Sequence, residues 1–148
     1  MSSLIASIWI PGEPVAWQRA GRNRITGRTY TPAQTDRWEK HVATCASLYW
    51  GRQAPLERPV CMDLFFYFPR PKYAVSKRKA MPVEPHIGRI DWDNLGNAVS
   101  DGLEKAGVIV NDRYIVDGRA RKYRVVGFGV QPPGVLVLIK VPENLLDE

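Results

Sequence analysis

The sequence has few cysteines and no long apolar run. Its two cysteines, Cys45 and Cys61, are too few for a disulfide scaffold. No apolar stretch approaches the roughly 18 residues that a membrane-spanning helix needs. The N-terminus also lacks a charged segment followed by a long apolar one. We therefore expect a protein of the reduced cytoplasm with no membrane segment.

Several catalytic patterns are also missing. The chain contains no P-loop, no G-x-G-x-x-G motif and no arrangement typical of a Ser-His-Asp or Cys-His nucleophile. These absences argue against covalent hydrolysis and nucleotide-driven chemistry. His41 and Cys45 have a spacing that zinc ligands also use, but only two histidines and two cysteines are present. Cys45 is more simply a buried small apolar residue.

The size and charge of the chain limit what it can be. Its 148 residues, 45% of them hydrophobic, suffice for one core, so we predict a single domain over residues 1–148. The net charge of +6 and the pI near 9.5 favour a polyanionic partner.

Hydrophobic periodicity and turn signals predict an α/β domain with two helices and a mixed sheet of approximately four strands. The predicted elements are a strand over 4–10, a helix from about 31 to 50, a strand over 60–68, a helix over 94–106, and strands over 115–126 and 135–141. The order is therefore β-α-β-α-β-β.

Three connections join these elements. Residues 11–30 form a basic loop that is hairpin-like near Thr26 and Gly27. Residues 69–90 are rich in proline and positive charge, and connections of this length in a compact domain are usually functional or disordered. A turn rich in glycine and proline over 127–134 joins the last two strands.

Both ends of the first helix carry recognisable signals. Thr31, Pro32 and Gln34 match a capping box at its start, and Gly51 is suited to end it. An apolar stripe at helical spacing should face the core: Trp38, Val42, Cys45 and Tyr49.

The second helix is predicted to follow Asp93, which is suited to its N-cap, and to end before Gly107. Gly96 and Gly102 within it each cost about 1 kcal/mol relative to alanine. Close approach to something at these positions is the expected reason for glycine.

The sharpest chemical feature is three aspartates around the second helix. Asp91 and Asp93 lie at its start, and Asp112 lies just beyond its end. Asp112 would return beside the other two if residues 108–110 ran back along the sheet. Mg²⁺ prefers carboxylate oxygens and completes its shell with waters and substrate phosphate oxygens. We therefore predict that Asp91, Asp93 and Asp112 form a catalytic metal site for phosphodiester cleavage.

Ordinary structural roles are the alternative for these carboxylates. Asp93 would then be a helix N-cap, Asp91 a surface residue and Asp112 part of a turn with Asn111. A calcium loop of the EF-hand type is excluded, because leucine and glycine stand where it requires oxygen ligands.

Positive charge is concentrated in three stretches, two of them in the loops 11–30 and 69–90. In the third, Arg119 and Arg121 alternate along a predicted strand and should share one face of the sheet. Such clusters suit a phosphate backbone, although a solvated charged surface is the alternative. The predicted DNA-binding residues are Arg19, Arg22, Arg24, Arg28, Lys77, Arg78, Lys79, Arg119 and Arg121.

Two segments resemble a known family. Residues 91–115, DWDNLGNAVSDGLEKAGVIVNDRYI, resemble the RusA-type Holliday junction resolvases in the spacing of their acidic clusters. Residues 10–35, IPGEPVAWQRAGRNRITGRTYTPAQT, resemble the front of the phage and Gram-positive branch of that family.

The resemblance implies a homodimeric α/β endonuclease that recognises four-way DNA junctions by shape. Such an enzyme nicks the strands symmetrically with Mg²⁺, or with Mn²⁺, during recombination and repair, here in a phage or prophage setting. Its functional carboxylates would be Asp91, Asp93 and Asp112.

The sequence departs from that family at two places. Asn97 stands where the family commonly has a lysine, and Asn111 replaces the first of two acidic residues. The missing lysine puts phosphate positioning in doubt, and Lys105, Arg113 or Arg89 are cations that could replace it. A non-catalytic nucleic-acid-binding module and a nuclease for other branched DNA are therefore the competing hypotheses.

Overall fold

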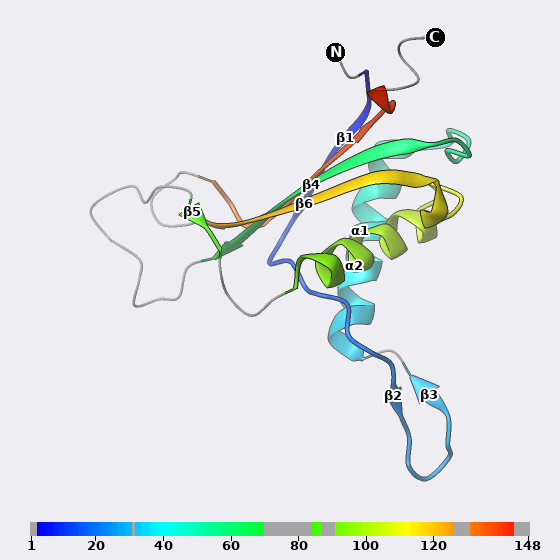
Figure 1. Cartoon of the computed structure of the whole chain (residues 1–148). Helices are drawn as coiled ribbons and strands as arrows, with labels where there is room; N and C mark the ends of the chain where they lie inside the picture. Colours follow the sequence, from blue (N-terminus) through cyan, green and yellow to red (C-terminus); the bar gives the residue numbers. More distant parts are fainter. Residues whose placement is uncertain (1–2, 31, 70–83, 87–90, 126–130, 144–148) are drawn as a thin grey trace.

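Two helices and one main sheet form most of the computed structural model, which describes residues 3–30, 32–69, 84–86, 91–125 and 131–143 (Figure 1). The elements are β1 (Leu4–Pro11), β2 (Gly21–Arg22), β3 (Thr29–Tyr30), α1 (Ala33–Trp50), β4 (Val60–Pro69), β5 (Glu84–Pro85), α2 (Trp92–Lys105), the 3-10 helix η2 (Asp112–Tyr114), β6 (Ile115–Val125) and β7 (Gly134–Lys140).

The main sheet has the strand order β1-β7-β4-β6-β5. β4 and β6 are parallel, whereas β1 with β7, β4 with β7 and β5 with β6 are antiparallel. The segment between β4 and β6 contains α2, which provides the crossover that parallel strands need. The predicted α/β fold with a mixed sheet of about four strands is confirmed: two-residue β5 extends four long strands, and β2 and β3 form a separate ribbon.

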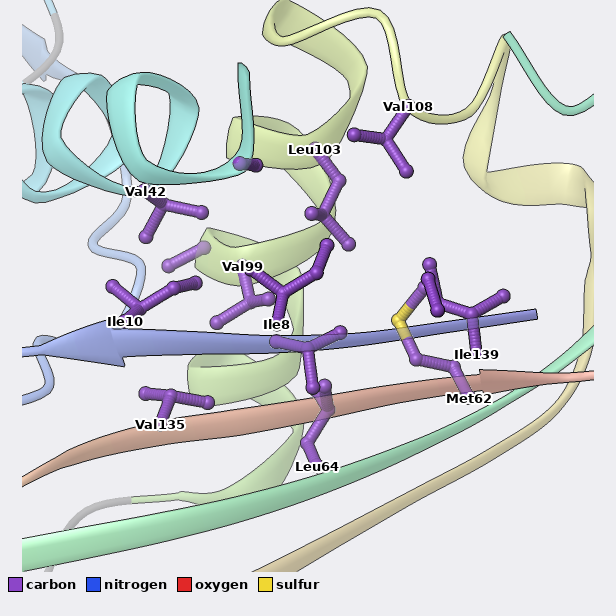
Figure 2. Close-up of a cluster of buried hydrophobic side chains, with 14 of the residues drawn as sticks. Ile8, Ile10, Val42, Met62, Leu64, Val99, Leu103, Val108, Val135 and Ile139 are labelled. Carbon is purple, nitrogen blue, oxygen red and sulfur yellow. The ribbon is translucent and has the colours of Figure 1, made fainter. Parts of the chain in front are cut away.

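The core lies between both helices and one face of the sheet. Side chains alternate along a strand, so every second residue points to this face. Figure 2 shows Val42 of α1, together with Val99 and Leu103 of α2, above Ile8 and Leu64 of the sheet. All five are buried, and burying such a side chain contributes roughly 1.5–3 kcal/mol. Packing on the sheet therefore determines where α2 lies.

The opposite face of the sheet carries paired charges and aromatic rings. The guanidinium carbon of Arg121 lies 4.7 Å from the centre of the Phe65 ring, and its Nη1 lies 3.5 Å from Asp63 Oδ1. Lys140 Nζ donates to Asp63 Oδ2 at 2.8 Å. Burial alone would raise the pKa of Asp63, but the hydrogen bond from Lys140 and the positive charges of Arg121 and Arg119 lower it overall.

α1 begins one residue later than its sequence signal predicts. Pro32 occupies the N-cap position without a side-chain cap hydrogen bond, and Thr31 lies outside the described residues. Gly51 ends the helix as predicted: its φ is 67° and its N–H donates to the carbonyl of Ser47. No helix in the described ranges is long and apolar enough to cross a membrane.

The apolar stripe predicted for α1 is only partly correct. Trp38 and Val42 are buried and Cys45 is half-buried, but Tyr49 is 50% exposed. The Tyr49 hydroxyl accepts the N–H of Ser7 at 3.2 Å, so this side chain contacts the edge strand β1 instead of the core.

α2 begins at Trp92, so Asp91 occupies its N-cap position. The prediction of Asp93 as the N-cap is wrong, because Asp93 already lies in the first helical turn. The carboxylate of Asp91 makes no capping hydrogen bond. Past the end of the helix, Gly107 has a φ of +76°, as the predicted C-terminal signal requires.

Close packing explains one of the two glycines inside α2. A Cβ at Gly102 would lie 2.5 Å from Val42 Cγ1 and 3.1 Å from the carbonyl oxygen of Glu39, both in α1. At Gly96 the nearest atom, Leu64 Cδ1, would be at an ordinary 3.9 Å. The expected close approach is therefore confirmed at Gly102, whereas at Gly96, which lines a pocket, the described residues of the chain leave room for a Cβ.

The hairpin predicted near Thr26 and Gly27 is confirmed as the β2–β3 ribbon, which projects from the body of the molecule (Figure 1). Asn23 Oδ1 accepts the N–H groups of Ile25 and Thr26, and Gly27 supplies a φ of 71°. Of the other two predicted connections, most of 69–90 and the first half of 127–134 lie outside the described residues.

Candidate active site

A pocket of about 240 Å³ lies between α2 and the strands β4 and β6. The strands contribute apolar side chains, among them Met62 and Leu64. Polar residues of its wall come from α2, η2 and β6: Asp93, Asn97 and Ser100, then Asp112, then Arg119. The pocket therefore brings together two of the three predicted carboxylates.

Asp93 belongs to the first turn of α2 and is exposed to solvent. The helix is anchored by the fully buried Leu95 and Val99, which leave Asp93 on the side that lines the pocket. Asp93 Oδ1 accepts only the N–H of the neighbouring Asn94, at 2.9 Å, among the hydrogen bonds of the described chain. The carboxylate is therefore not occupied by a contact to another element.

Asp112 reaches the pocket from the far end of α2. The chain first runs beside Leu56, whose N–H donates to the carbonyl of Val108 at 2.8 Å and whose carbonyl accepts the N–H of Val110 at 3.0 Å. This contact is an isolated bridge outside the main sheet, so Asp112 reaches the pocket without the run of residues 108–110 along the sheet that is the predicted condition for its return. Asp112 then opens η2, and its N–H donates to Glu104 Oε1 at 2.6 Å.

Asp91 is separate from this pair. It is exposed at the N-cap of α2 and is not among the described residues that line the pocket. Across the described ranges, no three or more His, Cys, Asp or Glu side chains are close enough together to hold a metal ion by themselves. The structure thus groups Asp93 with Asp112, and the third ligand stays a prediction.

The alternative roles in helix capping and turn formation explain little about the positions of these carboxylates. Asp91 makes no side-chain cap hydrogen bond, and Asp93 accepts only the N–H of the next residue, Asn94, among the hydrogen bonds of the described residues. The turn at residues 111–112 depends on Asn111, whose Oδ1 accepts the N–H of Arg113 at 2.9 Å, and not on the Asp112 carboxylate.

The zinc alternative finds no support either. His41 Nε2 lies 2.6 Å from the carbonyl oxygen of Pro11 and 3.8 Å from Cys45 Sγ. Within the part of the chain that the structure describes, no further side chain completes a metal site around this pair.

Two of the cations considered as replacements at Asn97 are engaged elsewhere. Lys105 Nζ donates to the buried Glu39 at 2.6 Å, on the α1 side of the helix. Arg113 lies over the ring of Tyr114, the next residue, and donates to its hydroxyl. Arg89 is outside the described residues. Among the described residues that line the pocket, Arg119 is the one cation.

Asp101 of α2 lies within electrostatic range of Asp112. Burial raises the pKa of Asp101 from its ordinary value of 3.8 to about 6, and the negative charges of Glu39, Glu104 and Asp112 add to this rise. The positive charge of Lys105 opposes it. The C-terminal half of α2 thus concentrates negative charge beside Asp112.

The predicted DNA-binding residues fall into three groups. Four exposed arginines belong to the β2–β3 ribbon or the segment leading to it: Arg19, Arg22, Arg24 and Arg28. That segment is tied to the start of α2, because the N–H of Trp17 donates to the carbonyl of Asn94 at 2.9 Å. Lys77, Arg78 and Lys79 lie outside the described residues.

The third group, Arg119 and Arg121, shares one face of the sheet as predicted, but this face is turned away from the helices. In the sheet register Arg119 pairs with Asp63 and Arg121 with Phe65, and strand alternation puts all four side chains opposite the core. Both arginines have carboxylate partners there: Arg119 Nε lies 3.6 Å from Asp117 Oδ1, and Arg121 pairs with Asp63.

A comparison with protein-family models identifies the chain. The model described as endodeoxyribonuclease RusA matches residues 11–139. The chain belongs to the RusA family. The match spans the ribbon, the pocket and all three predicted carboxylates, so the RusA resemblance found in two segments extends over most of the sequence. A search among curated proteins returned no significant match.

Three residues at or beside the candidate site are not predicted from the sequence: Trp92, Ser100 and Glu104. Trp92 is 60% exposed on the pocket wall, and its position between two predicted ligands is the one sequence signal that could have singled it out. Ser100 and Glu104 carry no such signal. The Ser100 hydroxyl donates within α2, to the carbonyl of Asn97, and Glu104 is noticed only through its contact with Asp112.

Proposed function

We propose that this RusA-family chain is a Mg²⁺-dependent endonuclease that resolves four-way DNA junctions by paired, symmetric nicks in recombination and repair. The convergence of Asp93 and Asp112 in one pocket carries the proposal. Family membership supplies the reaction class, which is cleavage within DNA.

The donor chemistry of the pocket fits Mg²⁺, with Mn²⁺ as a substitute. Mg²⁺ takes one or two carboxylates together with waters and substrate phosphate oxygens, so it does not need a closed set of three protein ligands. Asp93 and Asp112 would hold the ion, and Asp91 is the proposed third ligand. A bound metal supplies an activated water and neutralises charge on the phosphate.

The residues of the chain itself would bind and orient the DNA. The ribbon arginines are proposed to contact the phosphate backbone, which is the main source of affinity for DNA. Because Trp17 is bonded to Asn94, the segment that leads to the ribbon starts beside Asp93. The exposed indole of Trp92 offers a stacking surface for an unpaired base at the pocket.

Symmetric incision requires two active sites on one two-fold substrate. A closed dimer with two-fold symmetry provides this arrangement. We therefore include a homodimer in the proposal.

The test compares substrates and metal. A labelled four-way junction, a fork, a flap and a linear duplex of matched sequence are incubated with the chain in Mg²⁺ or in EDTA. We expect paired nicks in the junction only, and only with Mg²⁺. Tight junction binding without nicks in either Mg²⁺ or Mn²⁺ would instead favour a non-catalytic binding module, and preferred cutting of flaps or forks would favour a nuclease for other branched DNA.

A further inference from the structure

Asp93 and Asp112, the two carboxylates of the pocket, lie on elements that are joined by an irregular segment of backbone. Asp93 is in the first turn of α2, whereas Asp112 follows an irregular segment that leaves the helix at Gly107 and bonds to Leu56. Between the end of α2 and η2 the chain has no helix or strand, so α2 does not by itself set where Asp112 lies. A side-chain contact from α2 to the start of η2 would tie Asp112 directly to the helix that carries Asp93.

Glu104 makes this contact. Its carboxylate Oε1 accepts the backbone N–H of Asp112 at 2.6 Å. Hydrogen bonds to an ionised acceptor are shorter and about twice as strong as those between neutral groups. Asn111 Oδ1 accepts the next amide, that of Arg113, so the first two N–H groups of η2 each have a side-chain acceptor.

The surroundings of Glu104 leave it free for this role. Lys105, its neighbour in sequence, is bonded to Glu39, and no cation of the described chain forms an ion pair with Glu104. Glu104 is also not among the described residues that line the pocket. The hydrogen bond that Glu104 accepts from the Asp112 N–H is therefore the contact that indicates its role.

We infer that Glu104 is a positioning residue, which fixes Asp112 at the pocket by binding its backbone N–H from the same helix that carries Asp93. This inference rests on the proposed function for its catalytic consequence, since a displaced Asp112 would bind Mg²⁺ less well. The hydrogen bond itself can be measured without any cleavage.

Three substitutions separate the hydrogen bond from the charge. Glu104→Gln keeps the reach and the acceptor oxygen but removes the charge, Glu104→Asp keeps the charge but shortens the reach, and Glu104→Ala removes both. Glu57→Ala is the matched control, because Glu57 is exposed and its charge acts on Arg113 of η2 without a hydrogen bond to Asp112.

The first readout is hydrogen exchange of the Asp112 amide, measured by NMR in the full chain without DNA. Exchange is expected to accelerate about 10-fold or more in Glu104→Ala and Glu104→Asp, to accelerate clearly less in Glu104→Gln, which keeps a neutral acceptor oxygen, and to stay near wild type in Glu57→Ala. The second readout is the Mg²⁺ concentration for half-maximal junction cleavage, which should rise about 10-fold in the first two variants, as expected for the loss of a group that orients a metal ligand.

Unchanged exchange in folded Glu104→Ala would overturn the inference, and so would a Glu104→Gln variant that behaves like Glu104→Ala. If Glu104→Ala does not fold, the comparison of Gln with Asp gives the same decision. If wild type cuts no junction, the proposed function fails, whereas the exchange measurement still decides whether Glu104 holds Asp112.

Discussion

Among the described carboxyl groups, Asp101 is the one whose pKa the fold changes most. Burial raises its pKa to about 6, and Glu39 and Glu104 add negative charge nearby. The folded chain therefore binds this proton more tightly than the unfolded chain, in which the pKa is near 3.8. Asp101 supports folding when protonated, and this contribution is lost as the pH rises from about 4 to about 6.

We predict that Asp101→Asn is more stable than wild type at pH 7.5 and close to it at pH 4. Its urea midpoint should also depend less on pH between these values, because the variant has no carboxyl group to ionise there. Asp36→Asn is the control of opposite sign, since the hydrogen bond from Lys40 lowers the pKa of Asp36. Parallel pH curves for wild type and Asp101→Asn would contradict the prediction.

The helices α1 and α2 approach each other most closely at Gly102. The missing side chain leaves room for Val42 and for the backbone at Glu39. Glycine in a helix costs about 1 kcal/mol relative to alanine, but an added methyl group here would have to displace the buried Val42 side chain. At this position packing outweighs helix propensity.

Gly102→Ala is accordingly expected to lower the free energy of unfolding by about 1–3 kcal/mol, the usual cost of overpacking a core. Gly96→Ala is the matched control on the same helix, where an ordinary 3.9 Å contact allows a gain of up to about 1 kcal/mol. Urea unfolding of both variants tests this. Equal effects at the two glycines would mean that the helix contact is not tight.

Sequence signals predict the elements well where the signal is local. Gly51 and Gly107 end their helices because only a residue tolerant of positive φ suits these positions. The sequence predicts the start of α2 two residues too late because Asp91 and Asp93 both suit an N-cap. Local patterns cannot choose between such neighbours, since the choice depends on how the helix packs.

At the scale of the whole molecule, the sheet separates two different surfaces. The pocket and the tie between Trp17 and Asn94 lie on the side of the helices, whereas Arg119 and Arg121 carry paired charges on the other face. A DNA strand at the pocket is therefore expected to contact the ribbon arginines first. Contacts to the Arg121 side chain would require the DNA to pass the edge of the sheet, whereas Arg119 also lines the pocket and would contact DNA there only by breaking its ion pair with Asp117.

The sequence predicts the carboxylates of the candidate site but not the contacts that place them in one pocket. Spacing marks Asp93 and Asp112 as candidates, and the pocket groups them. Their proximity depends on the turn of the chain at Leu56 and on the bond from Glu104, which join residues with no periodic relation. The orientation of Arg119 likewise follows from which face of β6 packs under α2, which alternation alone does not decide.

The most direct test of the account measures junction binding and junction cleavage in parallel for wild type, Asp93→Asn and Asp112→Asn. Asp117→Asn is the control, because Asp117 is an exposed aspartate on the opposite face of the sheet. We predict that both pocket variants bind the junction as well as wild type and lose at least about 100-fold in Mg²⁺-dependent cleavage, while Asp117→Asn cuts normally. Normal cleavage by either folded pocket variant would contradict the assignment of the active site.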